Sequence, residues 1–419
     1  MQTEVGDQRK KAYDIKPQIT VPDMFMELKE DAESVWYTFS PHEVKEVLGF
    51  EISRVFDKEF EFVYGKCVEA YKQGKLKVVK EYKVKELWKK VLKVQFETGM
   101  PYIAFIDEIN RHNPNKHEGF IPCTNLCTES YSIVNDDYYH TCNLASIVFG
   151  RVEIDEIEEV AAIATRILDN GIELTKSPIE KSNAHNKRYR TVGVGCQGLH
   201  DIIAREGKTF YDEEFITGLA ERMEMGCVRE SIKLAQERGA YPAFKGSDWD
   251  NGNRIENFKK WSNRKEEWEE LQQEIDKYGI RNSQLTSPAP NTSTSIFMDA
   301  GAGVSPVYSA FFYEDNKDGV MPVVAMHLKK AAASYFQDVS KHKPWELVKS
   351  VAWMQRFVDT GISAEYIMNK NMPDFNAKYL WDTLNEAWKN KTKAVYYIRT
   401  IKKGTSLIKE AEVCAGCAG

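Results

Sequence analysis

The sequence predicts an α/β protein. Apolar runs with strand composition, Tyr102–Ile106 and Ala394–Thr400, are separated by longer segments whose apolar residues recur every three or four positions. The longest helical pattern covers Tyr211–Arg238 and carries its apolar residues four apart, at Phe215, Leu219, Met223 and Cys227. The 419 residues are enough for one large α/β unit or for two or three average domains.

Bulk composition narrows the functional classes. The chain is 42% hydrophobic and 29% charged, with a formal net charge of -6, so nucleic acid is not expected as its main partner. The first residues lack the apolar core of a signal peptide, and no apolar stretch is long enough to span a membrane, so we expect a cytoplasmic protein. Eight cysteines are too few for a disulfide scaffold, and those with a role should be catalytic, redox-active or metal-binding.

The first half of the chain leads to a strand and then to a cysteine-containing run. Gly99 should end a helix, and Pro101 should open the strand Tyr102–Ile106. A polar loop follows and reaches Cys123–Glu129. A second strand is expected within His140–Phe149, and Asp155 could cap a helix whose apolar stripe is Ile157, Val160, Ile163 and Ile167.

The second half should be mostly helical. Cys227 falls on the apolar stripe of the long helix and should be a core residue. The charged stretch Lys245–Lys277, with its three tryptophans, should form helical excursions at the surface. Pro344 should open a packing helix, and another should begin near Asp374. If Ala394–Thr400 is one strand, its two adjacent tyrosines point to opposite faces.

The run Cys123–Glu129 contains the residues best suited to catalysis. Its threonines and the preceding proline favour an extended backbone, whose period of two would put Asn125, Cys127 and Glu129 on one face. A thiol, an amide and a carboxylate on one pocket wall suit covalent or radical sulfur chemistry, with Glu129 moving a proton and Asn125 fixing a substrate hydroxyl. The alternative is a surface loop with an incidental thiol.

Two further motifs could take part. The hydroxyl-rich loop Asn291, Thr292, Ser293, Thr294 and Ser295 follows two prolines, and free N–H groups at a helix start bind anions such as phosphate. The alternative is a plain helix cap. The final segment carries Cys414 and Cys417 as a CxxC pair, which is either half of a metal site or a dithiol that exchanges electrons. Exchange is favoured because the sequence offers no second CxxC or His pair to complete a zinc site.

The order of these motifs resembles one family. NLCTE, CNLAS, PAPNTSTS, FVDTGIS and YYIRT together are similar to the large, catalytic subunit of class I ribonucleotide reductase. The resemblance implies the C-terminal part of a ten-stranded α/β barrel with an active-site finger loop, helical excursions and a flexible C-terminal tail. It divides the chain into a catalytic barrel part, residues 1–400, and a redox tail, residues 401–419.

The resemblance also implies roles near the substrate. Cys127 would become a transient thiyl radical that removes the 3′ hydrogen of a ribonucleotide. Glu129 would be the base on the 3′ hydroxyl, and Asn125 would bind the ribose. Cys142 would be one member of the dithiol that reduces the 2′ carbon as water leaves.

Other implied roles concern electrons and phosphate. Tyr396 and Tyr397 would relay the radical from a small subunit with a metal-centred radical cofactor. Cys414 and Cys417 would re-reduce the active-site disulfide and be reduced in turn by thioredoxin or glutaredoxin. Residues 291–295 would hold the diphosphate of the substrate. The chain itself would hold no metal or other cofactor.

The chain matches only the second part of that family's large subunit. We therefore expect a separately encoded N-terminal half to complete the barrel and to supply the partner of Cys142. The remaining cysteines before the tail carry no predicted role: Cys67, Cys123, Cys196 and Cys227. Alternatives are an inactive remnant that only binds reductase partners, a stand-alone thiol oxidoreductase that uses the CxxC pair, and a glycyl-radical enzyme.

Overall fold

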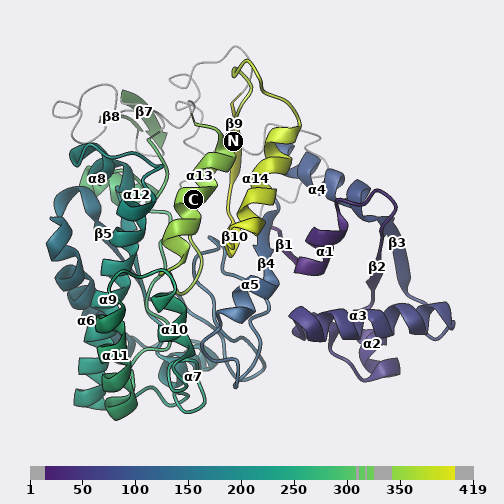
Figure 1. The fold of residues 1–419 in the computed structure, drawn as a ribbon, viewed down its shortest axis with the longest axis horizontal. Helices are drawn as coiled ribbons and strands as arrows, with labels where there is room; N and C mark the ends of the chain where they lie inside the picture. Colours follow the sequence, from purple (N-terminus) through teal and green to yellow (C-terminus); the bar gives the residue numbers. More distant parts are fainter. Residues whose placement is uncertain (1–14, 308–310, 317–318, 325–341, 402–419) are drawn as a thin grey trace.

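The computed structural model describes residues 15–307, 311–316, 319–324 and 342–401. This part of the chain is an α/β fold, as predicted, with helices packed around several small sheets (Figure 1). Of the helices it contains, none is long and apolar enough to cross a membrane. The predicted redox pair, Cys414 and Cys417, lies outside the described residues.

The central strand is β4 (Tyr102–Phe105), which joins the two ends of the described chain. It pairs in parallel with β1 (Gln18–Val21) and antiparallel with β10 (Ala394–Val395), so its two neighbours come from opposite ends of the sequence. The preceding helix α4 (Val84–Thr98) ends at Gly99, whose φ of 78° is the left-handed value that favours glycine. The predicted helix end and strand start are therefore confirmed.

Two parallel pairs flank the region that the cysteine run occupies. Strand β5 (Leu144–Val148) pairs with β6 (Gly193–Gln197), and β9 (Tyr366–Asn369) pairs with β11 (Ile398–Ile401). Within the described ranges the strands form separate sheets of three and two strands, and no closed barrel is seen. The α/β class is confirmed, whereas the closed ten-stranded ring stays a prediction.

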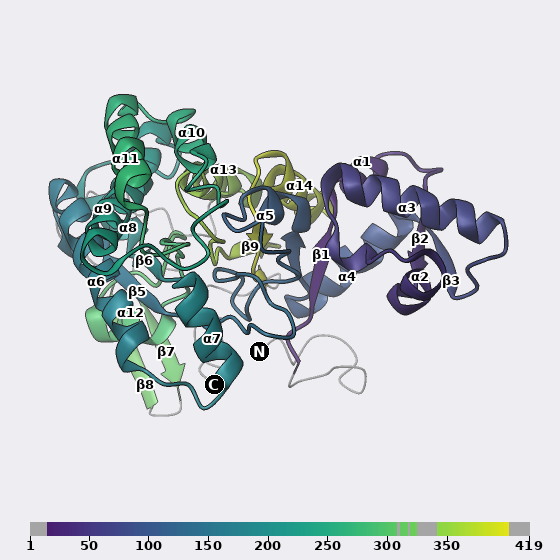
Figure 2. The ribbon, with the colours of Figure 1, turned by 90° about the horizontal axis from the view of Figure 1, so that it is seen from below.

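A small N-terminal unit projects from one end of the molecule. It contains the antiparallel strand pair β2 (Val35–Phe39) and β3 (Val79–Lys83), and helices α2 (Pro41–Leu48) and α3 (Asp57–Lys72) lie between these strands in the sequence. Its core is separate from the main one and is formed by Val44, Val63, Cys67, Ala70 and Leu76. Figure 2 shows this unit at the opposite end of the molecule from α9 and α11.

Helix α6 (Ile157–Leu174) packs along α9 (Glu213–Arg238). Gly226 of α9 allows the close approach, because a Cβ there would lie 2.3 Å from the Glu158 carbonyl oxygen. The predicted apolar stripe of α6 is wrong in part, since Ile163 is 53% exposed and Ile167 is 61% exposed. The buried face instead consists of Ile157, Ala161, Thr165, Asp169 and Ile172.

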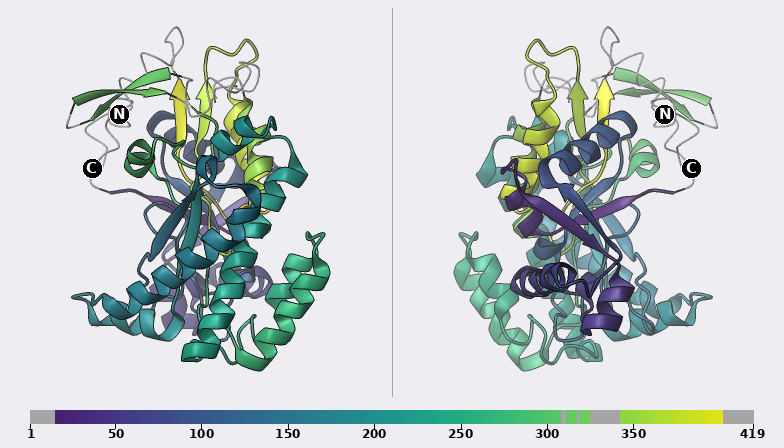
Figure 3. Two further views of the ribbon diagram at one scale, coloured as in Figure 1. Left: turned by 90° about the vertical axis from the view of Figure 1, so that its left-hand side faces the viewer. Right: turned by 90° about the vertical axis from the view of Figure 1, so that its right-hand side faces the viewer.

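The start of α6 also differs from the prediction. Glu153 and Glu156 form a capping box around a short 3-10 turn (Ile154–Glu156), so Asp155 is not the cap. Figure 3 shows the green helices α10 (Asn253–Lys259) and α11 (Lys265–Tyr278) below the yellow C-terminal elements. The stretch Lys245–Lys277 is not a surface excursion throughout, because Trp249, before α10, and Trp268, within α11, are fully buried, and the indole of Trp268 donates to Glu221.

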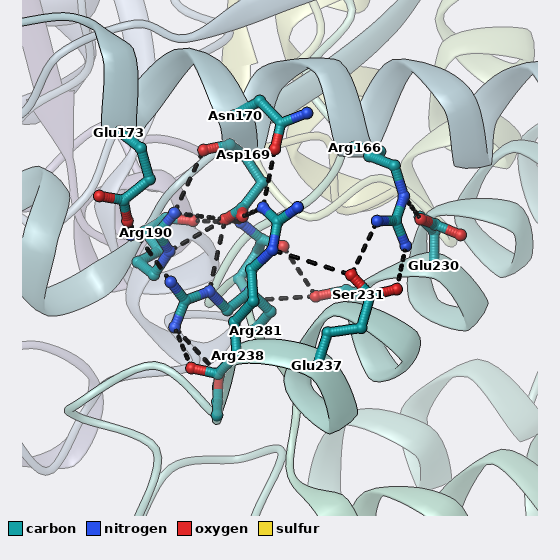
Figure 4. A network of polar contacts seen from close by, with 12 residues as sticks. Arg166, Asp169, Asn170, Glu173, Arg190, Glu230, Ser231, Glu237, Arg238 and Arg281 are labelled. Carbon is teal, nitrogen blue, oxygen red and sulfur yellow. Dashed lines mark hydrogen bonds and ion pairs between the residues drawn. The ribbon is translucent and has the colours of Figure 1, made fainter.

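A buried ionic network ties α6 to the C-terminal end of α9 and to the segment after α11 (Figure 4). Asp169 accepts hydrogen bonds from Arg190 at 2.7 Å and from Arg238 at 3.0 Å, and Arg281 lies 3.7 Å away. The amide of Asn282 donates to the same carboxylate. The network therefore fixes the start of the segment that continues into the hydroxyl-rich loop.

The remaining elements complete the fold. The helix that begins at Pro344 is confirmed as α13 (Pro344–Gln355), whereas the last helix begins later than Asp374, at Lys378. The other helices and strands are α1 (Asp23–Leu28), α5 (Ile106–Arg111), α7 (Glu180–Tyr189), α8 (Leu199–Arg205), α12 (Thr292–Met298), α14 (Lys378–Lys389), β7 (Phe311–Asn316), β8 (Gly319–Val324) and the 3-10 turns Ile52–Arg54 and Phe149–Arg151.

Candidate active site

The cysteine run is a tight turn, which corrects the prediction of an extended segment. The Asn125 N–H donates to the Ser130 carbonyl at 3.0 Å, and the Thr128 N–H donates to the Asn125 carbonyl at 3.2 Å. Thr128 has a φ of 68°, in the left-handed region that a β-branched residue rarely adopts. This reversal of the backbone replaces the period of two expected for a strand.

The turn brings the predicted side chains together by a different route. The Asn125 amide donates to Glu129 Oε1 at 2.8 Å and to the Cys142 sulfur at 3.5 Å. Glu129 is 2% exposed, and burial raises the pKa of its carboxyl. Burial and the nearby Glu129 carboxylate also raise the pKa of the half-buried Cys127 thiol. Asn125, Glu129 and Cys142 thus form one contiguous polar cluster.

Residues from the C-terminal third support the turn, and sequence reasoning predicts no role for them. The Ser363 hydroxyl donates to the Cys127 carbonyl at 2.6 Å and to Glu129 Oε2 at 3.2 Å. The Gly361 N–H and the Ser287 hydroxyl both donate to the Glu129 carbonyl, each at 2.9 Å. The FVDTGIS motif contains two of these residues, but nothing in its local pattern shows which carbonyls it contacts.

The surroundings of Cys142 contain a histidine pair that sequence reasoning also missed. Cys142 is exposed, and burial of part of its environment raises the pKa of its thiol. His140 Nε2 lies 2.7 Å from the Ser130 oxygen, and the rings of His140 and His185 are 5.1 Å apart. Burial lowers the pKa of His140 to about 4 and that of His185 to about 2, so both imidazoles are neutral near pH 7.

Three tyrosines lie beside the Cys127 thiol. Tyr396 and Tyr397 occupy the break between β10 and β11, and their ring centroids are 4.3 Å apart. The predicted single strand is therefore wrong at this point, and the two rings do not point to opposite faces. Tyr102 of β4 packs against both, at 4.9 Å and 5.0 Å. The Cys127 side chain packs against this cluster of three rings.

Of the residues in the hydroxyl-rich loop, Asn291 is the N-cap of α12, and Thr292, Ser293, Thr294 and Ser295 form the first turn of that helix. Thr292, Ser293 and Thr294 are exposed, so their hydroxyls can be reached from solvent. The Ser295 hydroxyl is different, because it is buried and donates to the Thr292 carbonyl at 2.9 Å. The Asn291 amide is likewise engaged with the Ala289 carbonyl at 2.8 Å.

One acidic cluster has the spacing of metal ligands. Oxygen atoms of Asp23, Asp57 and Asp107 lie within 4.8 Å of one another. Arg111 forms ion pairs with Asp23 and Asp57, and Asp107 accepts the backbone N–H groups of these same two residues. The Arg111 guanidinium thus takes the place that a bound cation would have beside Asp23 and Asp57, and the two N–H groups satisfy the oxygens of Asp107.

The chain is similar in sequence to several known proteins. Residues 1–398 match the family described as "Ribonucleotide reductase, barrel domain". The chain is 40% identical to the ribonucleoside-diphosphate reductase subunit alpha of Synechocystis sp., with all of this chain and 56% of that protein covered. It is 32% identical to the subunit of the same name from Treponema pallidum, with all of this chain and 51% of that protein covered.

The Helicobacter pylori subunit of that name is 28% identical over 94% of this chain and 58% of its own length. The chain thus spans about half the length of these curated relatives. The family match extends over the turn, the hydroxyl-rich loop and the tyrosine pair, which contain the predicted site residues before the tail. The chain belongs to the ribonucleotide reductase barrel-domain family.

Proposed function

We propose that this chain forms the catalytic part of a ribonucleoside-diphosphate reductase, which replaces the 2′ hydroxyl of a ribonucleotide with hydrogen. The observation that carries the proposal is the placement of the Cys127 turn. The Cys127 side chain packs against Tyr396 and its neighbouring tyrosines, while Asn125 links Glu129 to Cys142. A radical route, a base and a redox thiol thus converge on one turn.

The radical would reach Cys127 through the tyrosines. Burial raises the pKa of Tyr396 far above its ordinary value, and the neighbouring Cys127 and Tyr102 add to this effect. A phenolate is therefore costly there, so the electron and the proton should leave Cys127 together, with the proton passing to the Tyr396 oxygen. The small subunit, which carries the metal-centred radical, would supply the oxidising equivalent through Tyr397.

The chemistry at the ribose follows from the remaining groups. The Cys127 sulfur radical would take the 3′ hydrogen, and Glu129 would accept the proton of the 3′ hydroxyl while Asn125 holds the carboxylate and the ribose. The 2′ hydroxyl then leaves as water, taking a proton from the thiol pair formed by Cys142 and a second cysteine. This pair supplies two electrons and two protons by forming a disulfide, so that one hydrogen enters the water and the other goes to the 2′ carbon. Glu129 returns its proton to the 3′ oxygen, and the 3′ hydrogen returns from the Cys127 thiol, which regenerates the sulfur radical.

The substrate and the reductant complete the proposed cycle. The exposed hydroxyls of Thr292, Ser293 and Thr294, with Asn291 and Ser295 shaping the loop, would receive the diphosphate. Cys414 and Cys417 would reduce the active-site disulfide by exchange, and thioredoxin or glutaredoxin would reduce them in turn.

The exposure of side chains at the site supports the proposal that a further protein segment covers it. Leu126, next to the reactive cysteine, is 60% exposed, and Phe297 of α12 is 88% exposed. Cys142 is exposed as well. A sulfur radical must be shielded from solvent and oxidants, so we expect a segment equivalent to the remaining part of the longer relatives to cover this face and to bring the second thiol.

A reconstitution experiment tests the proposal. The chain would be combined with the radical-bearing small subunit and with a segment equivalent to the uncovered part of the relatives, and reduction of cytidine diphosphate would be followed by chromatography. We expect deoxycytidine diphosphate from the complete mixture alone. Product formed at the same rate without the added segment would refute the shared site, and no product from the complete mixture would refute the activity.

A further inference from the structure

We propose that Ser363 is a positioning residue that holds the Cys127 sulfur and the Glu129 carboxylate in register with each other and with the hydroxyl-rich loop. The inference rests on the proposed function for its catalytic meaning. The serine lies 236 residues from Cys127 in the chain, yet its hydroxyl is 2.6 Å from the Cys127 carbonyl oxygen. It is a buried residue, 7% exposed.

The Ser363 side chain contacts both ends of the reactive turn. Its oxygen lies within hydrogen-bonding distance of the Cys127 carbonyl and, at 3.2 Å, of Glu129 Oε2. One hydroxyl has one proton, so it can donate fully to one acceptor at a time, or share the proton between them. The carbonyl contact fixes the backbone that carries the sulfur, while the carboxylate contact orients the proposed base.

The turn needs such an anchor because its backbone is strained. Thr128, between the reactive cysteine and Glu129, is fully buried with a φ of 68°. Strained residues persist only where the surroundings over-determine their conformation. Gly361 packs against this point so closely that a Cβ would lie 2.1 Å from the Thr128 carbonyl oxygen. The Gly361 N–H also donates to the Glu129 carbonyl.

The same segment holds the start of the hydroxyl-rich loop. The Ser363 N–H donates to the Pro288 carbonyl at 3.0 Å. Three residues before Ser363, the Thr360 hydroxyl donates to the Thr286 carbonyl at 2.9 Å. Ser363 therefore touches the turn through its side chain and, through its backbone, Pro288 in the segment that leads into the hydroxyl-rich loop. A diphosphate that shifts the loop would move the sulfur and the carboxylate through this segment, with Ser363 as the residue that contacts both.

The test compares Ser363→Ala with Ser350→Ala in the reconstituted complex. Ser350 is a matched control, since it is 2% exposed and its hydroxyl also donates to a backbone carbonyl, that of Leu347 at 2.8 Å. Loss of the anchor should lower kcat for cytidine diphosphate by about 10- to 100-fold, as expected for a misplaced reacting group. The KM should change by less than about threefold, because Ser363 is not expected to touch substrate.

A second readout needs no turnover. The rate of Cys127 alkylation by iodoacetamide, followed by mass spectrometry of the peptide that contains it, reports how firmly the turn is held. We expect Ser363→Ala to raise this rate at least about threefold, and Ser350→Ala to leave it unchanged. Ser363→Thr, which keeps the hydroxyl, should restore most of the wild-type rate. If Ser363→Ala does not fold, Ser363→Cys, which replaces the oxygen by a weaker donor, takes its place.

The two readouts separate this inference from the proposed function. If the wild-type complex reduces no nucleotide but Ser363→Ala still speeds alkylation, the proposed function fails while the anchoring role of Ser363 stands. If nucleotide reduction is normal and Ser363→Ala matches Ser350→Ala in both kcat and alkylation, the positioning role is overturned. An effect of equal size from Ser350→Ala would overturn it too, because general destabilisation would then explain both.

Discussion

Replacement of Asp169 by alanine should cost more stability than any single exposed charge. Asp169 is fully buried, and its oxygen atoms contact the side chains of Arg190 and Arg238, with Arg281 beside them. Removing one partner of a buried pair typically costs about 3–5 kcal/mol. Arg190 is 3% exposed but keeps a 2.5 Å ion pair with Glu173, so we expect the lower end, about 3 kcal/mol.

Urea unfolding of the protein, followed by circular dichroism, measures this change. Glu237→Ala is the matched control, because its ion pair with Arg166 at 2.7 Å is partly exposed on both sides and should contribute about 0.5 kcal/mol. Each substitution removes one carboxylate from the packed pair of helices α6 and α9. A loss of less than about 1 kcal/mol for Asp169→Ala would refute the reasoning that burial makes this network essential.

Three other changes test the chemistry. Asn125→Ala should move the acidic limb of the rate profile up by about one pH unit, since Glu129 loses a hydrogen bond that lowers its raised pKa. Burial raises the pKa of Glu224 to about 7, so this group stabilises the fold fully below about pH 4.5, and its contribution is lost as the pH rises through 7. Glu224→Gln should therefore make the free energy of unfolding less dependent on pH, as measured by urea titrations at pH 5 and 7.5. Serine at both Cys414 and Cys417 should spare turnover with a small dithiol and abolish it with thioredoxin; equal activity with both reductants would contradict the exchange role.

Local signals predicted the fold class and several elements. Gly99 and Pro101 mark a helix end and a strand start that depend on neighbouring backbone only, and both are found where expected. The face of α6 could not be predicted in this way. Its buried side includes Asp169, which is stabilised there by arginines from other parts of the chain, whereas Ile163 remains exposed.

The candidate site also combines features that local sequence signals predict with features that depend on contacts between distant segments. Asn125, Cys127 and Glu129 were chosen for their chemistry and an assumed strand, yet a left-handed residue in a turn brings Asn125 and Glu129 together. Ser363 and Tyr102 were missed because their roles come from contacts across the fold. A short motif tells which residue types are present, but contacts between distant segments decide which of them meet.

The most direct test of the central claim is the isotope effect on nucleotide reduction by the reconstituted complex. Cytidine diphosphate with deuterium at the 3′ carbon should turn over more slowly than the unlabelled substrate, because the Cys127 sulfur takes that hydrogen. Cys127→Ser should then form no deoxynucleotide with either substrate under any reductant. Turnover by Cys127→Ser at the wild-type rate, with the same isotope effect, would contradict the account.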